Sequence, residues 1–99
     1  MPDYILSKKV LEDLSSIWDY TFNVWSETQA DKYYKELIAS CISLSKNKLV
    51  GSAYFEIYPE LLGLKVNRYI VFYIRNSSKE ILIVRILHQR MDLKSRIEE

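Results

Sequence analysis

Glycine, proline, cysteine and histidine are scarce in this sequence, with two, two, one and one residues among 99. Phosphate-cradling loops need several glycines, so Gly51 and Gly63 alone exclude a P-loop nucleotide hydrolase. The single cysteine, Cys41, excludes an internal disulfide and fits a reducing, cytoplasmic setting. One cysteine and one histidine, His88, cannot supply the ligands of an ordinary zinc site, so we expect neither a metal nor another cofactor.

Long hydrophobic runs are also missing. The first ten residues, MPDYILSKKV, hold no signal-peptide apolar region. The longest apolar run of strand-forming residues, YIVFYI at 69–74, is far too short to span a bilayer. The composition, with 48% hydrophobic and 27% charged residues, is typical of a soluble globular protein. We therefore expect a single domain over residues 1–99.

The net charge of +1 hides an asymmetry along the chain. Residues 1–59 hold six lysines and eight acidic residues, a balance of −2, whereas residues 60–99 hold eight lysines and arginines and five acidic residues, a balance of +3. A basic half can meet an acidic partner or a phosphate. The alternative is a solvated surface of mixed charge, because the imbalance is small beside the basic stripe of a dedicated nucleic-acid binder.

Two helices are predicted in the first half of the chain. Ser7 is a candidate N-cap for a helix whose apolar positions recur every three or four residues as far as Trp25. Ser26 is a candidate N-cap for a second helix that runs to about Lys46, and Gln29 stands where a capping box has Glu or Gln. The joint between them is so short that the two helices should form an antiparallel hairpin. Their apolar faces comprise Val10, Leu14, Ile17, Trp18, Thr21 and Trp25 in the first, and Ala30, Tyr33, Tyr34, Leu37, Cys41 and Leu44 in the second.

Segments rich in β-branched and aromatic residues follow the helices. The predicted strands are 61–66, 68–75 and 79–88, with tight turns at 66–68 and 76–78 and a further short strand at 3–6. Residues 46–59 should form a loop with some extended backbone. The order β-α-α-β-β-β predicts an α+β fold, in which the helical hairpin packs on one face of an antiparallel β-meander.

Alternation in the last strand assigns Arg85 and His88 to opposite faces of the sheet. It groups Ile81, Ile83, Arg85 and Leu87 on one side, and Leu82, Val84, Ile86 and His88 on the other. The tail from Met91 to Ile97 is expected to form a last helical turn, within a C-terminal segment, 91–99, that is expected to be flexible.

Two kinds of side chain could belong either to a site or to the core. Tyr69 and Tyr73 share one face of a strand, where exposed rings would stack on nucleic-acid bases. The alternative is that they pack under the helical hairpin with their hydroxyls at its edge. Cys41 lies on the apolar face of the second helix, which favours a small core residue over a reactive thiol.

Four segments together resemble ParE-type toxins, within the wider ParE/RelE superfamily of bacterial toxin–antitoxin systems. The segments are DL..IWDYT...W from Asp13, S..QA..Y...L from Ser26, YP.L.GL.V..Y.VFY from Tyr58 and I.I.RILH.RMD from Ile81. The resemblance covers nearly the whole chain, and the order and spacing of the segments carry it. It implies a toxin that stops growth until a cognate, ParD-like antitoxin covers it. The better-known ParE-like toxins inhibit DNA gyrase, whereas RelE-like toxins cut messenger RNA on the ribosome.

Two positions depart from the family pattern. Lys65 stands where arginine often follows Gly-Leu, and Tyr69 stands where histidine often precedes the strand. Lysine keeps the positive charge but lacks the guanidinium fork, and tyrosine does not titrate near neutral pH. A family role at either position would therefore have to work without the guanidinium fork or the titrating imidazole.

An RNA-cleaving toxin needs an acid, a base and cations around the phosphate. The catalytic residues of such an enzyme would here be Lys65, Arg85 and His88. No tyrosine follows His88, and strand alternation divides it from Arg85, so the set is incomplete. We therefore expect inhibition of DNA gyrase by binding, with a RelE-like endoribonuclease or an inactive interaction-domain relic as the alternatives.

Two binding surfaces are predicted on this basis. The target-binding surface is the end of the last strand with the tail that follows it, namely Arg85, His88, Arg90, Met91, Asp92 and Leu93. The antitoxin-binding surface gathers apolar residues in excess of one small core, namely Trp18, Trp25, Phe55, Ile57 and Leu62. Exposed apolar surface of this kind is suited to a partner's amphipathic helix or added strand.

Overall fold

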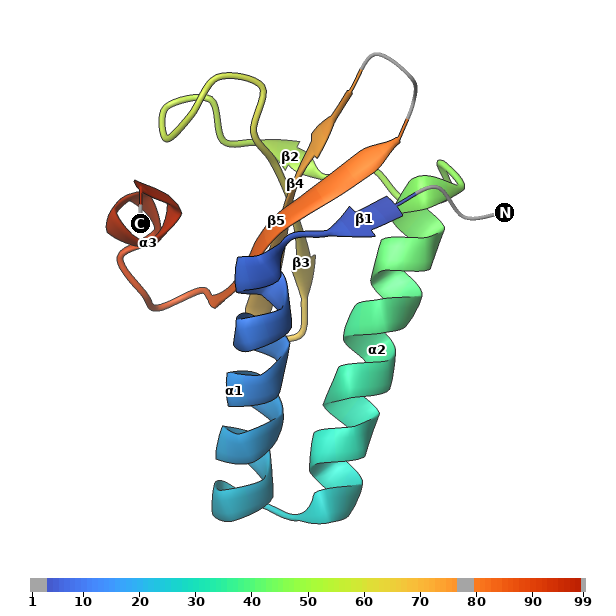
Figure 1. Cartoon of the computed structure of the whole chain (residues 1–99), viewed down its shortest axis with the longest axis vertical. Coiled ribbons are helices and arrows are strands. Elements are labelled where there is room, and N and C mark those ends of the chain that lie inside the picture. The colour runs from blue at the N-terminus through green and yellow to red at the C-terminus, as the bar shows by residue number, and fades with distance from the viewer. Residues whose placement is uncertain (1–3, 77–79, 99) are drawn as a thin grey trace.

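The computed structural model describes residues 4–76 and 80–98 and has the predicted α+β architecture, with a helical hairpin beside a five-stranded sheet (Figure 1). The elements are β1 (Tyr4–Leu6), α1 (Lys8–Val24), α2 (Glu27–Ser45), β2 (Ser52–Ala53), β3 (Leu62–Val66), β4 (Tyr69–Arg75), β5 (Ile81–His88) and α3 (Leu93–Glu98). The predicted turn at 76–78 lies outside the described residues except for Asn76. No helix of the described part is long and apolar enough to cross a membrane.

Both predicted N-caps are confirmed. The Ser7 hydroxyl accepts a hydrogen bond from the backbone N–H of Val10 at 3.2 Å, and the Ser26 hydroxyl accepts one from Gln29 at 3.1 Å. In a complete capping box, the Gln29 side chain would accept a hydrogen bond from the backbone N–H of Ser26. Here that N–H donates instead to the carbonyl of Thr21 at the end of α1. The tight joint and the two caps make α1 and α2 antiparallel neighbours.

The sheet has the strand order β1-β5-β4-β3-β2. Strands β2 to β5 form the predicted antiparallel meander, and β1 pairs in parallel with β5, so the sheet as a whole is mixed. A parallel partner needs a long crossover, and the chain between β1 and β5 contains the hairpin of α1 and α2 followed by strands β2 to β4. The predicted loop at 46–59 contains β2, a strand of two residues at the sheet edge.

A β-bulge in β5 overturns the predicted alternation of that strand. Phe72 pairs with Arg85 and Tyr73 pairs with Ile83, so Val84 is an extra residue without an opposite partner. As a result Ile83 lies under the helical hairpin, whereas Leu87 belongs to the cluster on the other face, so the predicted grouping of the two is wrong. Arg85 still lies on the opposite face from His88, because both follow the bulge.

The sheet is covered on both faces rather than on one. The larger cluster, under the hairpin, includes Val10, Leu14, Leu37, Cys41, Leu44, Val71, Tyr73, Ile81, Ile83 and Ile86. A second cluster on the other face is built from Leu61, Ile70, Phe72 and Leu87, and half-buried Leu93 and Ile97 of α3 pack against it. The predicted helical turn in the tail is thus a helix with a packing role. The unbroken apolar run of β4 agrees with a strand that is buried on both faces.

Candidate functional site

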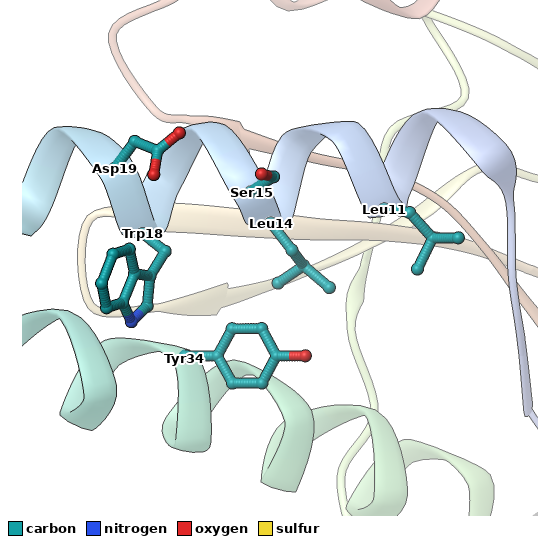
Figure 2. A pocket seen from close by; sticks show the side chains of 6 residues that line it. All are labelled: Leu11, Leu14, Ser15, Trp18, Asp19 and Tyr34. Atoms are coloured by element: carbon teal, nitrogen blue, oxygen red, sulfur yellow. The ribbon is translucent and has the colours of Figure 1, made fainter.

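A shallow groove runs along the outer side of the helical hairpin, between α1 and α2 (Figure 2). It has a volume of about 290 Å³ and is lined by Leu11, Leu14, Ser15, Trp18, Asp19 and Tyr34. Leu11 is 55% exposed, so much of its side chain is open to a partner. The groove therefore presents apolar surface with carboxylate and hydroxyl groups at its rim.

Two contacts hold the side chain of Trp18 in place within this groove. Its indole N–H donates to the carboxylate of Asp31 across the hairpin at 3.0 Å, and its ring stacks on Phe22 with centroids 5.2 Å apart. Trp25 follows at the end of α1 and is 71% exposed. Both tryptophans present aromatic surface that a partner could bury.

The other residues predicted for the antitoxin-binding surface lie elsewhere. Phe55 is exposed in the loop after β2, Ile57 packs against the cluster beside α3, and Leu62 packs against the cluster under the hairpin. Ile57 and Leu62 are therefore largely core residues, and the five do not form one surface. Sequence reasoning missed Leu11 and Tyr34 as groove residues, because helical periodicity marks an apolar stripe without showing where the partner helix stops covering it.

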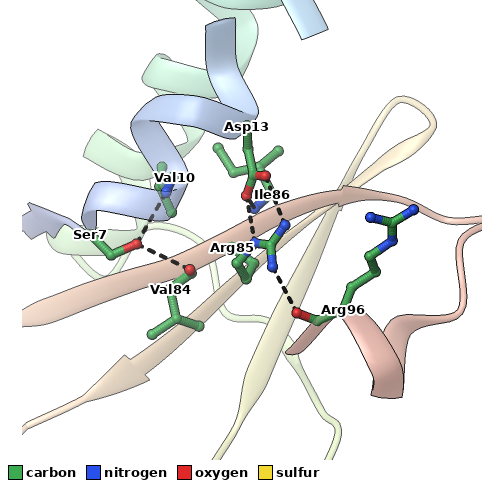
Figure 3. A network of polar contacts seen from close by, with 7 residues as sticks. All are labelled: Ser7, Val10, Asp13, Val84, Arg85, Ile86 and Arg96. Atoms are coloured by element: carbon green, nitrogen blue, oxygen red, sulfur yellow. Dashed lines mark hydrogen bonds and ion pairs between the residues drawn. The ribbon is translucent and has the colours of Figure 1, made fainter. Parts of the chain in front are cut away.

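Arg85 forms the main polar link of the fold (Figure 3). Its Nε and Nη2 donate to the two carboxylate oxygens of Asp13 on α1, at 2.8 and 2.9 Å, and its Nη1 donates to the backbone carbonyl of Arg96 on α3 at 2.7 Å. The side chains of Arg85 and Asp13 are each only 12% exposed. A single arginine therefore connects β5 to a helix on each side of the sheet.

Asp13 also accepts the backbone N–H of Ile86 at 3.0 Å. Strand β1 ends opposite Ile83, so β5 has no strand neighbour on that side beyond this residue. The Ser7 hydroxyl donates to the carbonyl of Val84 in the same stretch. Helix α1 thus satisfies the free edge of β5 through Ser7 and Asp13 (Figure 3).

The three residues proposed as catalytic in a ribonuclease do not converge. Lys65 pairs with Ile70, which belongs to the cluster beside α3, and Arg85 is on that same face but engaged by Asp13. His88 lies on the opposite face, where its ring meets the Tyr69 ring edge-on at 5.4 Å. Its Nδ1 accepts the backbone N–H of Arg90 at 3.1 Å. The imidazole therefore helps to shape the turn that follows β5.

The tyrosines on β4 belong to the core, as in the packing alternative. Tyr69 and Tyr73 are both buried, so neither ring can stack on a base. The Tyr73 hydroxyl accepts the backbone N–H of Gly51 at 2.8 Å. Burial raises the pKa of Tyr69, against a smaller lowering by its hydrogen bond with Thr21.

The remainder of the predicted target-binding surface follows β5. Arg90 and Met91 are exposed, whereas Leu93 packs against the second cluster. The carboxylate of Asp92 accepts bonds from the hydroxyl and the backbone N–H of Ser95, and these lower the pKa of Asp92. Asp92 thus stabilises the start of α3 while it remains exposed. The exposed members of the predicted surface are therefore Arg90, Met91 and Asp92, and His88 is half-buried.

Cys41 has the character of a core residue. Its side chain is fully buried, and burial raises the pKa of the thiol to about 11. At neutral pH the thiolate, which is the reactive form, is correspondingly scarce. Among the described residues no group of three His, Cys, Asp or Glu side chains could hold a metal ion.

Comparisons with known proteins agree with the fold and with the segments described above. The curated relatives include Toxin ParE1 of Mycobacterium tuberculosis, 36% identical over 90 residues that cover 91% of this chain and 92% of the relative. They also include Toxin ParE of Escherichia coli, 29% identical over 99 residues, covering 100% and 96%. A solved structure titled "Chromosomal ParDE TA system from P. aeruginosa" superposes with a TM-score of 0.74 at 20% identity, covering 89% of this chain and 96% of that chain.

The profile of one protein family matches nearly the whole of the folded region. The match extends over residues 4–93, from β1 to the start of α3, and the family is described as "ParE toxin of type II toxin-antitoxin system, parDE". The matched range includes the groove of the hairpin, the Arg85–Asp13 pair and the end of β5. The chain therefore belongs to the ParE toxin family of type II toxin–antitoxin systems.

Proposed function

We propose that this chain arrests bacterial growth by binding DNA gyrase, and that it does not itself cut RNA. The observation that supports binding over cleavage is the Arg85–Asp13 pair. A ribonuclease would direct this guanidinium at the phosphate, whereas here two of its nitrogens bond a carboxylate of the same chain. Releasing it would leave a largely buried carboxylate without its partner, which is costly.

The proposal is tested by comparing the targets directly. The purified chain is added to gyrase in a supercoiling and DNA-cleavage assay, and DNA and protein synthesis are pulse-labelled just after the chain is induced in a bacterial host. We expect loss of supercoiling, and DNA synthesis should stop before protein synthesis. An early stop of protein synthesis with intact supercoiling would instead assign the chain to the RNA-cleaving toxins.

His88→Ala separates the two mechanisms within one host. A ribonuclease that loses its acid or base slows by about 10²- to 10⁴-fold. In a gyrase-binding toxin the change removes a ring that packs on Tyr69 and shapes a turn, so growth arrest should be weakened but retained. The readout is the induction level that halves growth, with Gln89→Ala as an exposed neighbouring control. Complete loss of toxicity in a folded His88→Ala protein would contradict the binding mechanism.

We further propose that a cognate antitoxin neutralises the chain by laying an apolar helix face into the groove between α1 and α2. The groove offers the exposed leucine, Leu11, and two aromatic walls, Trp18 and Tyr34, on one side of the molecule. A helix seated in such a groove presents anchors at spacings of three and four residues. Asp19 at the rim favours a partner with lysine or arginine beside those anchors.

Leu11→Asp should weaken antitoxin binding by about tenfold or more, because buried interface anchors are worth about 1–2 kcal/mol or more. The fold should not change, since Leu11 is 55% exposed. Binding is measured by titrating a purified ParD-like cognate antitoxin against the purified chain. Val50→Asp is the matched control, because Val50 is 72% exposed and lies outside the groove. Equal affinities for the two variants would place the antitoxin elsewhere.

A further inference from the structure

A group of exposed cations lies at the end of the sheet where β3 turns into β4 and β5 ends. The backbone N–H of Gln89 donates to the carbonyl of Arg68 at 2.9 Å, which brings the segment after β5 against the β3–β4 turn. Arg68 and Arg90 therefore belong to one end of the sheet, and Lys65 lies two pairs inward on β3. All three side chains are exposed.

These cations have no acidic partner among the residues that the structure describes. Across residues 4–76 and 80–98, neither Lys65 nor Arg68 nor Arg90 takes part in an ion pair. The acidic groups that the neighbouring segments supply are engaged by neutral donors: Glu36 by the side-chain amide of Asn67, and Asp92 by Ser95. Unpaired like charges held at one end of a fold attract an external anion.

Arg75 and Arg85 are used differently. Arg85 is bound to Asp13 and to the carbonyl of Arg96, and the guanidinium of Arg75 lies 6.0 Å from the centre of the Tyr73 ring. Arg75 of β4 and Arg85 of β5 thus contact groups of the same chain, whereas Arg68 and Arg90 remain available to an external group. An available guanidinium fits a phosphate through two parallel N–H donors.

From this arrangement we propose that the sheet end formed by Lys65, Arg68 and Arg90 contacts the phosphodiester backbone of duplex DNA. The contact involves no base reading, because the nearby rings of Tyr69 and His88 pack against each other and Tyr69 is buried. The surface between the two arginines is polar, with Asn67 and Gln89 exposed, which suits a phosphate backbone. Met91, which follows Arg90 and is 42% exposed, stays available to a protein target. The choice of DNA rests on the proposed function, since DNA is the polymer that gyrase holds.

The salt dependence of binding tests this proposal. Fluorescence anisotropy of a short labelled duplex is measured with the chain alone, between roughly 50 and 200 mM salt. Each phosphate contact contributes about 0.9 to the slope of log K against log salt. Arg68→Gln with Arg90→Gln should therefore reduce the slope by about 1.8. A Lys46→Gln with Lys48→Gln variant, which removes the same charge beyond the end of α2, should keep the wild-type slope.

A double variant that conserves the charge is the matched control. Arg68→Lys with Arg90→Lys keeps the charge, so the slope should remain near that of the wild type. The proposal is overturned if the wild-type chain binds no duplex at the lowest salt, if the glutamine and control variants have equal slopes, or if single-stranded RNA of the same sequence binds more tightly. Gyrase inhibition without DNA binding would defeat this inference alone, and DNA binding without gyrase inhibition would defeat the proposed function alone.

Discussion

Asp13→Ala is expected to lower the free energy of unfolding by about 3 kcal/mol, since breaking a mostly buried ion pair by removing one partner typically costs that much. The carboxylate holds two donors of Arg85 and the backbone N–H of Ile86. Its removal leaves a guanidinium that is 12% exposed without a counter-charge, together with an unsatisfied N–H on the edge of β5. Urea unfolding followed by far-ultraviolet circular dichroism measures the change.

Two further substitutions separate the parts of this effect. Glu12→Ala removes an exposed carboxylate from the same turn of α1 and should change the stability by less than about 0.5 kcal/mol. Asp13→Asn keeps an acceptor oxygen for the N–H of Ile86 but removes the charge. Its loss of stability should therefore lie between those of Asp13→Ala and Glu12→Ala. If Asp13→Ala were no more destabilising than Glu12→Ala, the pair would be a surface contact with no structural role.

The sequence predicts those parts of the fold that depend on neighbouring residues. Ser7 and Ser26 could be identified as N-caps because the cap hydroxyl bonds an amide three residues ahead. The turn at Asn67 followed from two strand-like segments separated by polar residues. By contrast, the Asp13–Arg85 pair joins residues 72 apart in the chain, and no local pattern indicates it.

The β-bulge shows why the candidate site was only partly predictable. Strict alternation is a property of a regular strand, and one extra residue at Val84 exchanges the two faces beyond it. The groove could not be predicted for a similar reason. A stripe of apolar residues on α1 predicts burial, but in the folded chain Leu14 is buried and Leu11 stays exposed. Which residues of an apolar face stay exposed depends on the packing of two helices rather than on the spacing within one.

Gly51→Ala is expected to lower the free energy of unfolding by about 3 kcal/mol, from overpacking of about 1–3 kcal/mol together with a weakened, partly buried hydrogen bond. A Cβ at Gly51 would lie 2.6 Å from the carbonyl oxygen of Gly63 and 3.0 Å from the Tyr73 ring. The first of these is backbone, in the residue that pairs with Ser52, so it cannot move without shifting β2 against β3. The only two glycines of the chain thus stand against each other, where any side chain on Gly51 would separate the strands.

The hydroxyl of Tyr73 gives this expectation an internal comparison. It accepts the N–H of Gly51 and is buried, so Tyr73→Phe removes the same hydrogen bond without adding an atom. Tyr73→Phe should cost about 1–2 kcal/mol, and the excess for Gly51→Ala then measures the collision of the two backbones. Ser52→Ala adds no atom at an exposed neighbouring position and should be nearly neutral. Equal losses for Gly51→Ala and Tyr73→Phe would mean that the loop before β2 moves aside, and that close approach does not explain why glycine is needed there.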